Sequence, residues 1–154
     1  MKWDILEIKK MLKNNLSDYR YNHSLRVMEE ASNLAKHYNG DVEKCMVVAL
    51  VHDMCKEYTD KENEEFIKKY NLPKELLLEE NKKIVHGYVA SILVKEKYNF
   101  TKDMVLAVRY HTTGYPNMDL LAKIVYLADK IEKGKNYIGI EDERTLAYKD
   151  IDEA

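Results

Sequence analysis

The sequence has little of what marks several common classes of protein. Its 154 residues include two prolines and five glycines, which suits neither a turn-rich β-sandwich nor a disordered segment. It has no run of about 18 uninterrupted apolar residues, so it predicts no membrane-spanning helix. The first residues also lack the apolar stretch of a signal peptide. We therefore expect a cytoplasmic protein with no membrane partner.

A large excess of one charge and a closely spaced cysteine pair are also missing. The formal net charge of -2 provides no general attraction to nucleic acid, so any bound polyphosphate must be held by local cations or by metal. Cys45 and Cys55 fall on one predicted helix, about 15 Å apart, whereas a disulfide needs Cα atoms within about 7 Å. We expect two buried, reduced thiols.

Helical periodicity is present along most of the chain. Apolar residues make up 45% of the sequence and recur at helical spacing, which predicts an all-α fold with six or so major helices in one domain over residues 1–154. The first helix is expected over residues 3–16, and the second is expected to stop at Gly40. Side chains suited to capping a helix N-terminus precede four of the helices: Ser17, Asp41, Thr101 and Asp119.

The most apolar stretch runs from Cys45 to Cys55 and predicts a central, fully buried helix. A His-Asp doublet, His52-Asp53, lies in its last turns. Residues 59–71 are charged around a few apolar positions, which predicts a short surface helix that acts as a cover.

The chain has five histidines, and three besides His52 fall on the apolar faces of separate predicted helices. One aspartate does the same on a further helix. With the doublet they form the candidate ligand set: His23, His52, Asp53, His86, His111 and Asp129. His37 is left out because it sits in a last helical turn, where a solvated imidazole is favourable. Gly87, beside His86, costs about 1 kcal/mol relative to Ala inside a helix, so it indicates close approach of a neighbour or a ligand.

Imidazole nitrogens and carboxylate oxygens are the donors that Zn, Fe, Mn and Co accept in proteins. Four histidines and two aspartates exceed what one four-coordinate ion requires, so two metal ions that share a carboxylate fit the inventory better. The alternative is that the histidines are separately hydrogen-bonded core residues and that the aspartates cap helices or form salt bridges. The residue types and their spacing leave both interpretations open.

Five segments carry a resemblance to a known family. The ligand order, a His followed by His-Asp and then by distal His and Asp residues, resembles that of the HD metal-dependent phosphohydrolase superfamily. Within it, residues 18–137 are most similar to the YqeK-type symmetrical bis(5'-nucleosyl)-tetraphosphatases. The matching segments are Arg20-Tyr21-Asn22-His23-Ser24-Leu25, Leu50-Val51-His52-Asp53-Met54-Cys55-Lys56, Val85-His86-Gly87, Arg109-Tyr110-His111-Thr112-Thr113-Gly114 and Tyr126-Leu127-Ala128-Asp129-Lys130-Ile131-Glu132.

The resemblance implies a single HD domain with a di-iron site, for which Mn, Co or Zn are the alternatives. One metal ion would be held by His23, His52 and Asp129, and the other by His86 and His111. Asp53 would bridge the two. The family usually continues through further helical turns after residues 146–148, whereas this chain stops at residue 154. The resemblance therefore leaves open whether the nucleotide pocket is complete and whether the protein forms a homodimer.

A bridged metal pair lowers the pKa of a bound water and offsets charge on a transferring phosphoryl group, as hydrolysis of a phosphoanhydride requires. The resemblance implies diadenosine tetraphosphate as the substrate, and we expect a metal-bridged hydroxide to cleave it into two ADP, with Asp53, Lys56 and Arg109 as the catalytic residues. The expected substrate contacts are Lys56, Arg109, Thr112, Thr113 and Lys133. The alternatives are solvated surface charges for the cations and helix-end capping for the threonines.

Three other functions are compatible with the sequence. The first is a different nucleotide phosphohydrolase, acting on a nucleoside diphosphate or an alarmone. The second is an oxygenase, because a His/Asp di-iron centre can activate oxygen; the cations near the ligands disfavour it. The third is a catalytically silent sensing or partner-binding module, which the complete ligand set disfavours. Product analysis and oxygen uptake distinguish these activities.

Overall fold

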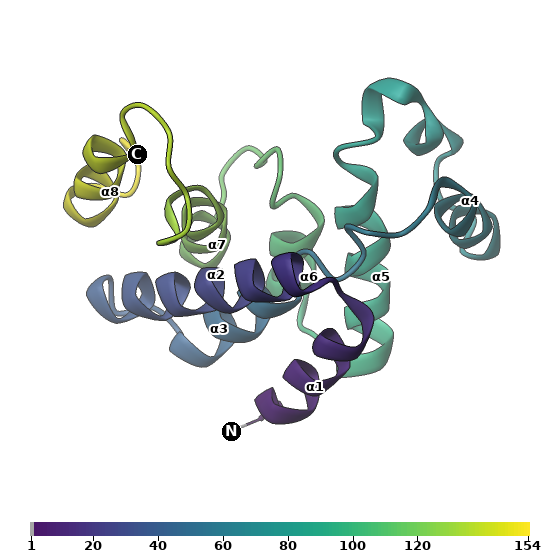
Figure 1. Ribbon diagram of the computed structural model, residues 1–154, viewed down its shortest axis with the longest axis horizontal. Helices are drawn as coiled ribbons and strands as arrows, with labels where there is room; N and C mark the ends of the chain where they lie inside the picture. Colours follow the sequence, from purple (N-terminus) through teal and green to yellow (C-terminus); the bar gives the residue numbers. More distant parts are fainter. Residues whose placement is uncertain (1) are drawn as a thin grey trace.

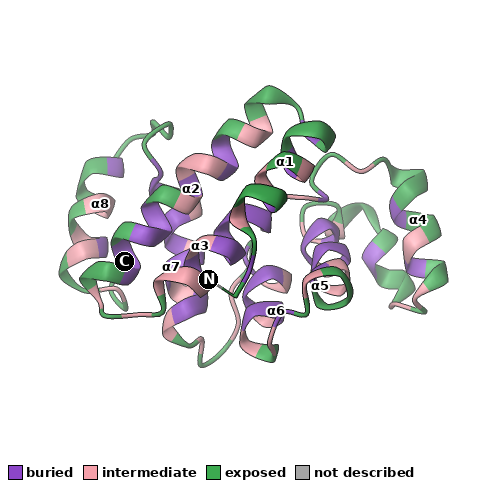
Figure 2. Cartoon of the chain, turned by 90° about the horizontal axis from the view of Figure 1, so that it is seen from below, coloured by how far each residue is buried: buried purple, intermediate pink, exposed green. Residues whose placement is uncertain are grey.

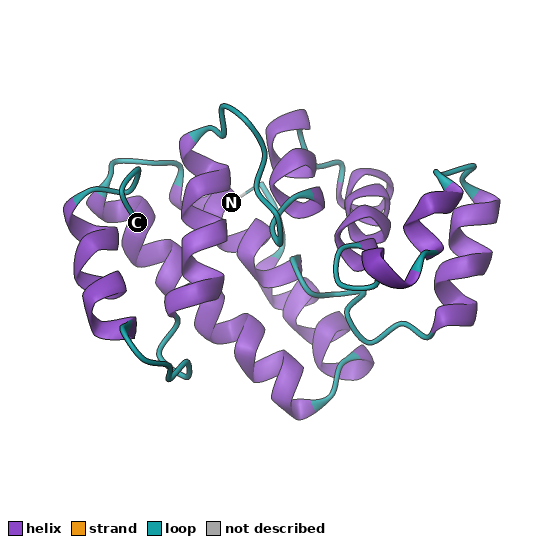
Figure 3. Cartoon of the chain, turned by 90° about the horizontal axis from the view of Figure 1, so that it is seen from above, coloured by secondary structure: helices purple, strands orange, loops and turns teal. Residues whose placement is uncertain are grey.

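The computed structural model describes residues 2–154, and within that range the chain forms α-helices and short 3₁₀ helices without any β-strand (Figure 3). The all-α prediction is thus confirmed. The α-helices are α1 (Ile5–Asn15), α2 (Asp18–His37), α3 (Val42–Val51), α4 (Asp60–Lys69), α5 (Val85–Tyr98), α6 (Lys102–Arg109), α7 (Leu120–Ile131) and α8 (Ile140–Lys149), and the 3₁₀ helices are η1 (Lys74–Leu77) and η2 (Glu79–Asn81). In the part of the chain that the structure describes, no helix has the length and apolar character needed to cross a membrane.

Five helices form the body of the molecule. α2 packs along α3 and α7, α6 packs between α5 and α7, and α3 contacts both α6 and α7. The helices α4 and α8 lie at opposite ends of this body (Figure 1). The short surface helix predicted over residues 59–71 is therefore present as α4. It packs against α5 and η1 at one end of the molecule.

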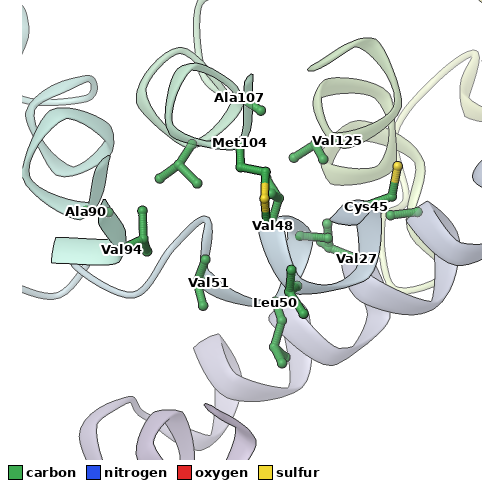
Figure 4. Close-up of a cluster of buried hydrophobic side chains, with 14 of the residues drawn as sticks. Val27, Cys45, Val48, Leu50, Val51, Ala90, Val94, Met104, Ala107 and Val125 are labelled. Atoms are coloured by element: carbon green, nitrogen blue, oxygen red, sulfur yellow. The ribbon is translucent and has the colours of Figure 1, made fainter. Parts of the chain in front are cut away.

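The core is built around α3, as its apolar sequence predicts. Every residue from Val47 to Val51 is fully buried. Val48 and Leu50 belong to a cluster of buried side chains to which other helices contribute, including Met104 of α6 and Val125 of α7 (Figure 4). The helices α1, α2, α4 and α8 each bury one side and expose the opposite one (Figure 2). α6 and α7 are more enclosed, since most of their residues are buried or half-buried. Burial of this kind stabilises a fold by roughly 25 cal/mol per Å² of apolar surface.

Three of the four predicted N-caps make the hydrogen bond that the prediction requires. Each accepts a backbone N–H three residues further along, at 2.9 to 3.2 Å: Ser17 at α2, Asp41 at α3 and Asp119 at α7. Thr101 is the N-cap of α6, but its hydroxyl donates to the carboxylate of Asp103 instead of accepting from the backbone.

The prediction that Gly40 ends α2 is wrong, because a different residue takes the left-handed conformation that ends the helix. The helix ends at His37, and Asn39 takes the left-handed conformation, with φ of 55°. Gly40 instead donates its N–H to the carbonyl oxygen of Ala35 at 2.7 Å. Within the described residues, all non-glycine residues with positive φ are asparagines, namely Asn39, Asn71, Asn99 and Asn117. Asn tolerates this conformation because its short polar side chain can hydrogen-bond locally, and so a chain with few glycines still turns sharply.

The prediction that Cys45 and Cys55 share a helix is also wrong. α3 ends at Val51, and the chain then follows tighter turns, in which Met54 donates to the Val51 carbonyl at 3.0 Å. Both cysteines are nevertheless free and buried, as expected. Burial raises the pKa of each thiol to about 12, so neither is a ready nucleophile.

The end of α7 is held by α8. Arg144 donates to three backbone carbonyl oxygens there, those of Ile131 at 2.9 Å, Glu132 at 2.8 Å and Lys135 at 3.1 Å. Ile131 is the last residue of α7, and its carbonyl has no partner within the helix because the last carbonyls of a helix have no N–H to accept from. α8 thus fixes the conformation of the segment that follows α7.

Candidate metal centre

The structure brings all six predicted ligands together from five segments. His23 lies on α2, His52 and Asp53 follow directly after α3, and His86 is in the first turn of α5. Asp129 is in the last turn of α7. His111 lies two residues beyond the end of α6, and not on the helix as predicted. Their donor atoms form two groups, each within 4.8 Å, which share one residue: His23, His52, Asp53 and Asp129; and Asp53, His86 and His111.

The first group converges on Asp129 and one oxygen of Asp53. Oδ1 of Asp129 lies 2.9 Å from Nε2 of His23 and 3.4 Å from Nε2 of His52. Oδ2 of Asp53 lies 3.5 Å and 3.4 Å from the same two nitrogens. Ligands about 2.1 Å from one ion are separated by about 3.0 Å at right angles and about 3.4 Å at the tetrahedral angle. The separations therefore fit donors arranged around a common ion.

The second group converges on the other oxygen of Asp53. Nε2 of His86 and Nε2 of His111 are 3.0 Å apart, and they lie 3.3 Å and 3.4 Å from Oδ1 of Asp53. Asp53 therefore directs Oδ2 to one group and Oδ1 to the other. A carboxylate in this position can bridge two metal ions.

The imidazoles are oriented for ligation through Nε2. Nδ1–H of His52 donates to the carbonyl of Ala49 at 2.5 Å, and Nδ1–H of His111 donates to that of Val108 at 2.7 Å. With the proton committed to Nδ1, the lone pair of Nε2 points at the carboxylates, as a metal ligand requires. Nε2 of His52 is buried and has no hydrogen-bond partner. A buried, unpaired donor atom in such a cluster fits a metal ion.

Gly87 sets how closely α5, which carries His86, approaches the end of α6, which His111 follows. A Cβ at this position would lie 2.5 Å from the backbone oxygen of Arg109, which is closer than real Cβ atoms approach any atom. The expectation that Gly87 permits close approach of a neighbour is thus confirmed, and the neighbour is the end of α6. The contact allows His86 and His111 to reach each other.

The ligands shift one another's pKa values through their charges. Burial favours neutral His52, but the carboxylates of Asp53 and Asp129 outweigh it and raise the pKa of His52 well above its ordinary value. Burial raises and the surrounding imidazoles lower the pKa of Asp53, and the net change is downward. Burial and the neighbouring His111 lower the pKa of His86. A proton on His52 competes with metal, so metal affinity falls as the pH is lowered.

Two charged residues contact the ligands, and a third contacts one of these two; none was assigned a role from the sequence. Arg20 donates from Nη1 to Oδ2 of Asp53 at 3.1 Å. The carboxylate of Glu132 lies 3.1 Å from Nδ1 of His23 and accepts from Nε of Arg26 at 2.8 Å. Helical spacing could have indicated the two arginines, since Arg20 and Arg26 lie three residues before and after His23 and therefore near its face of the helix.

The predicted phosphate-binding cations differ in their surroundings. Lys56 is exposed, follows Asp53 by one turn, and its charge contributes to lowering the pKa of His86. Arg109 is half-buried and donates from Nε to the hydroxyl of Ser91 at 3.0 Å. Lys133 pairs with Glu29 of α2 at 3.1 Å on the exposed surface. Only Lys56 of the three has no ionic or hydrogen-bonded side-chain partner among the described residues.

The two threonines lie in the loop that follows His111. Both are exposed, and the hydroxyl of Thr113 donates to the carbonyl of Gly114 at 2.9 Å. Their roles as substrate contacts stay predictions, as do those of Lys56, Arg109 and Lys133.

An all-helical bundle with buried His and Asp donors in two overlapping groups defines a class of metal-dependent protein. Residues 20–134 match the HD domain family. The chain belongs to this family, whose members are metal-dependent.

The chain is also similar to named relatives over most of its length. It is 36% identical to the "Bis(5'-nucleosyl)-tetraphosphatase, symmetrical" of Staphylococcus aureus, with 94% of this chain and 75% of the relative covered. It is 34% identical to the Bacillus subtilis protein of the same name, with 93% and 77% covered. A crystal structure from Clostridium acetobutylicum, described as a predicted HD superfamily hydrolase involved in NAD metabolism, superposes with a TM-score of 0.89 at 38% identity, with 98% of this chain and 80% of that chain covered.

Proposed function

We propose that this protein hydrolyses diadenosine tetraphosphate at its central phosphoanhydride bond and releases two molecules of ADP. Two observations support the proposal. The donor atoms form two groups joined by Asp53, which suits a dinuclear phosphohydrolase. Relatives that share more than a third of its residues carry the name of the symmetrical tetraphosphatase.

The proposed cofactor is a pair of metal ions, with iron as the first candidate and Mn, Co and Zn as the alternatives. His23, His52 and Asp129 would hold one ion, His86 and His111 the other, and Asp53 both. When bound, such a pair lowers the pKa of a water molecule and offsets negative charge on the transferring phosphoryl group.

The exposure of the residues at the centre supports one side as the entry for the substrate. The side chain of Asp129 is 26% exposed and that of Arg20 is 23% exposed, whereas the four histidine ligands are almost completely buried. The polyphosphate would therefore enter between Arg20 and the exposed side of Asp129. Lys56, one turn beyond Asp53, would supply a further positive charge. The buried imidazoles would stay inaccessible to bulk water.

The position of cleavage can be measured directly. We expect metal-loaded protein in ¹⁸O-labelled water to convert diadenosine tetraphosphate into ADP alone, with one label in one of each two ADP molecules. Attack on the second phosphorus from either end expels the other half of the symmetric substrate as ADP. Chromatography with mass spectrometry identifies both the products and the label.

AMP and ATP as the initial products would contradict central cleavage, because they arise from attack on the outer phosphorus. NAD⁺ is the appropriate competing substrate, since the crystallised relative from Clostridium acetobutylicum is described as acting in NAD metabolism. Faster hydrolysis of NAD⁺ than of the tetraphosphate would overturn the substrate assignment while leaving the metal centre intact.

A further inference from the structure

Glu132 is a buried carboxylate behind the metal centre. It is the C-cap residue of α7, and its side chain is 1% exposed. Removing a carboxylate from water costs several kcal/mol unless it gains compensating partners. Here the partners are His23, on the side of the metal centre, and Arg26, on the side of the solvent.

The contact distinguishes His23 from the other three imidazoles. His52 and His111 direct Nδ1 to backbone carbonyls three residues earlier, and Nδ1 of His86 is buried without a partner. His23 alone among the four directs Nδ1 to a charged side chain, and that side chain comes from a helix 109 residues further along the chain. A carboxylate partner makes an imidazole a stronger donor to metal than a carbonyl partner does.

The surroundings of Glu132 keep its carboxylate in place. Arg26 donates from Nε to the same oxygen, Oε2, that faces His23. Gly134 makes room for this arginine, because a Cβ there would lie 2.5 Å from Nε of Arg26. Arg144 of α8 fixes the backbone by donating to the carbonyl oxygen of Glu132 itself.

We propose that Glu132 is a positioning residue for one of the two metal ions, the one ligated by His23, and that it has no such role for the ion at His86 and His111. Arg26 holds the carboxylate against His23. The inference rests on the proposed pair of metal ions. It concerns a difference in how the two sites hold their ions, and not the reaction that the ions serve.

Glu132→Gln is the sharpest test, because glutamine keeps the shape and an oxygen acceptor while it removes the charge. The Mn²⁺ affinity is measured by electron paramagnetic resonance in two backgrounds. His86→Ala leaves the first group of ligands complete, and there Glu132→Gln is expected to weaken Mn²⁺ binding about 10- to 100-fold. His23→Ala leaves the second group, and there the same substitution is expected to change the affinity less than about twofold.

Equal weakening in both backgrounds would overturn the proposal, since it would show a general structural role. No weakening in either background would overturn it as well. Glu29→Gln removes an exposed carboxylate of α2 and is expected to leave both affinities unchanged. Arg26→Gln is a second variant at a position that is 34% exposed, and it is expected to weaken only the His23 site, by about threefold to tenfold.

The failure of this proposal differs from the failure of the proposed function. If the unsubstituted protein binds two ions and cleaves the tetraphosphate, but Glu132→Gln binds both ions normally, only the role of Glu132 is wrong. If Glu132→Gln weakens one site as expected while the unsubstituted protein cleaves no dinucleoside polyphosphate, only the substrate assignment is wrong. Circular dichroism of each variant separates both results from loss of the fold.

Discussion

Asp53→Ala is expected to leave the protein with less than one tightly bound metal ion and to lower hydrolysis by about a thousandfold or more. The reason is that Asp53 directs one oxygen to each group of ligands, at 3.3 to 3.5 Å from four different imidazole nitrogens. Elemental analysis after reconstitution with Fe or Mn measures the stoichiometry, and ADP release measures the rate.

His37→Ala is the matched control, because it removes a histidine outside the centre. His37 lies at the end of α2, where its Nε2 contacts the carbonyl oxygen of Tyr148 of α8. We expect its metal content and rate to stay close to those of the unsubstituted protein. If Asp53→Ala still bound two ions, or if both variants lost metal equally, the bridging assignment of Asp53 would be wrong.

Gly87→Ala is expected to destabilise the folded protein by about 2 kcal/mol and to weaken the metal site at His86 and His111. Alanine gains about 1 kcal/mol in helix propensity over glycine. Its Cβ, however, would lie 2.5 Å from a backbone oxygen of α6, which cannot rotate away as a side chain could. Overpacking of this kind costs about 1 to 3 kcal/mol or more, so the steric term outweighs the propensity. Urea unfolding of the metal-free protein measures the loss.

Gly40→Ala tests whether the effect is specific to position 87. A Cβ at Gly40 would meet side-chain methyl groups of Leu120 and Ile124 at 3.3 and 3.4 Å, and these can adjust. Its backbone does not require positive φ. We expect a change within about 1 kcal/mol in either direction. Comparable stability for Gly87→Ala and Gly40→Ala would show that α5 and α6 can separate without cost.

The parts of the fold that depend on local chemistry were predictable from the sequence. Ser17, Asp41 and Asp119 cap helices because their side chains accept backbone N–H groups three residues away, and such contacts need no knowledge of the rest of the chain. The end of α3 was not predictable in this way. No Gly or Pro occurs within ten residues after Val51. The helix gives way to turns at the doublet, where the side chains of His52 and Asp53 meet residues from distant helices.

The six candidate ligands could be selected from the sequence because they fall on predicted apolar faces or in the His-Asp doublet. The residues that contact these ligands could not be selected in this way. The contact between His23 and Glu132 joins residues 109 positions apart, and helical periodicity carries no information about such pairs. Lys133 illustrates the same limit. Its phosphate contact stays a prediction, but the pairing of its ammonium with Glu29, 104 residues earlier, could not be predicted from helical spacing.

Asn39, which has the left-handed conformation at the end of α2, is also a site at which the protein can deamidate. An asparagine that precedes glycine loses its amide when the following backbone nitrogen attacks the side-chain carbonyl, and Asn39-Gly40 is such a pair. In the folded chain that nitrogen is engaged, since Gly40 donates its N–H to Ala35 at 2.7 Å. Attack therefore requires the last turn of α2 to open. Deamidation at Asn39 would accumulate in proportion to that opening, so the hydrogen bond of Gly40 governs the chemical lifetime of the end of α2.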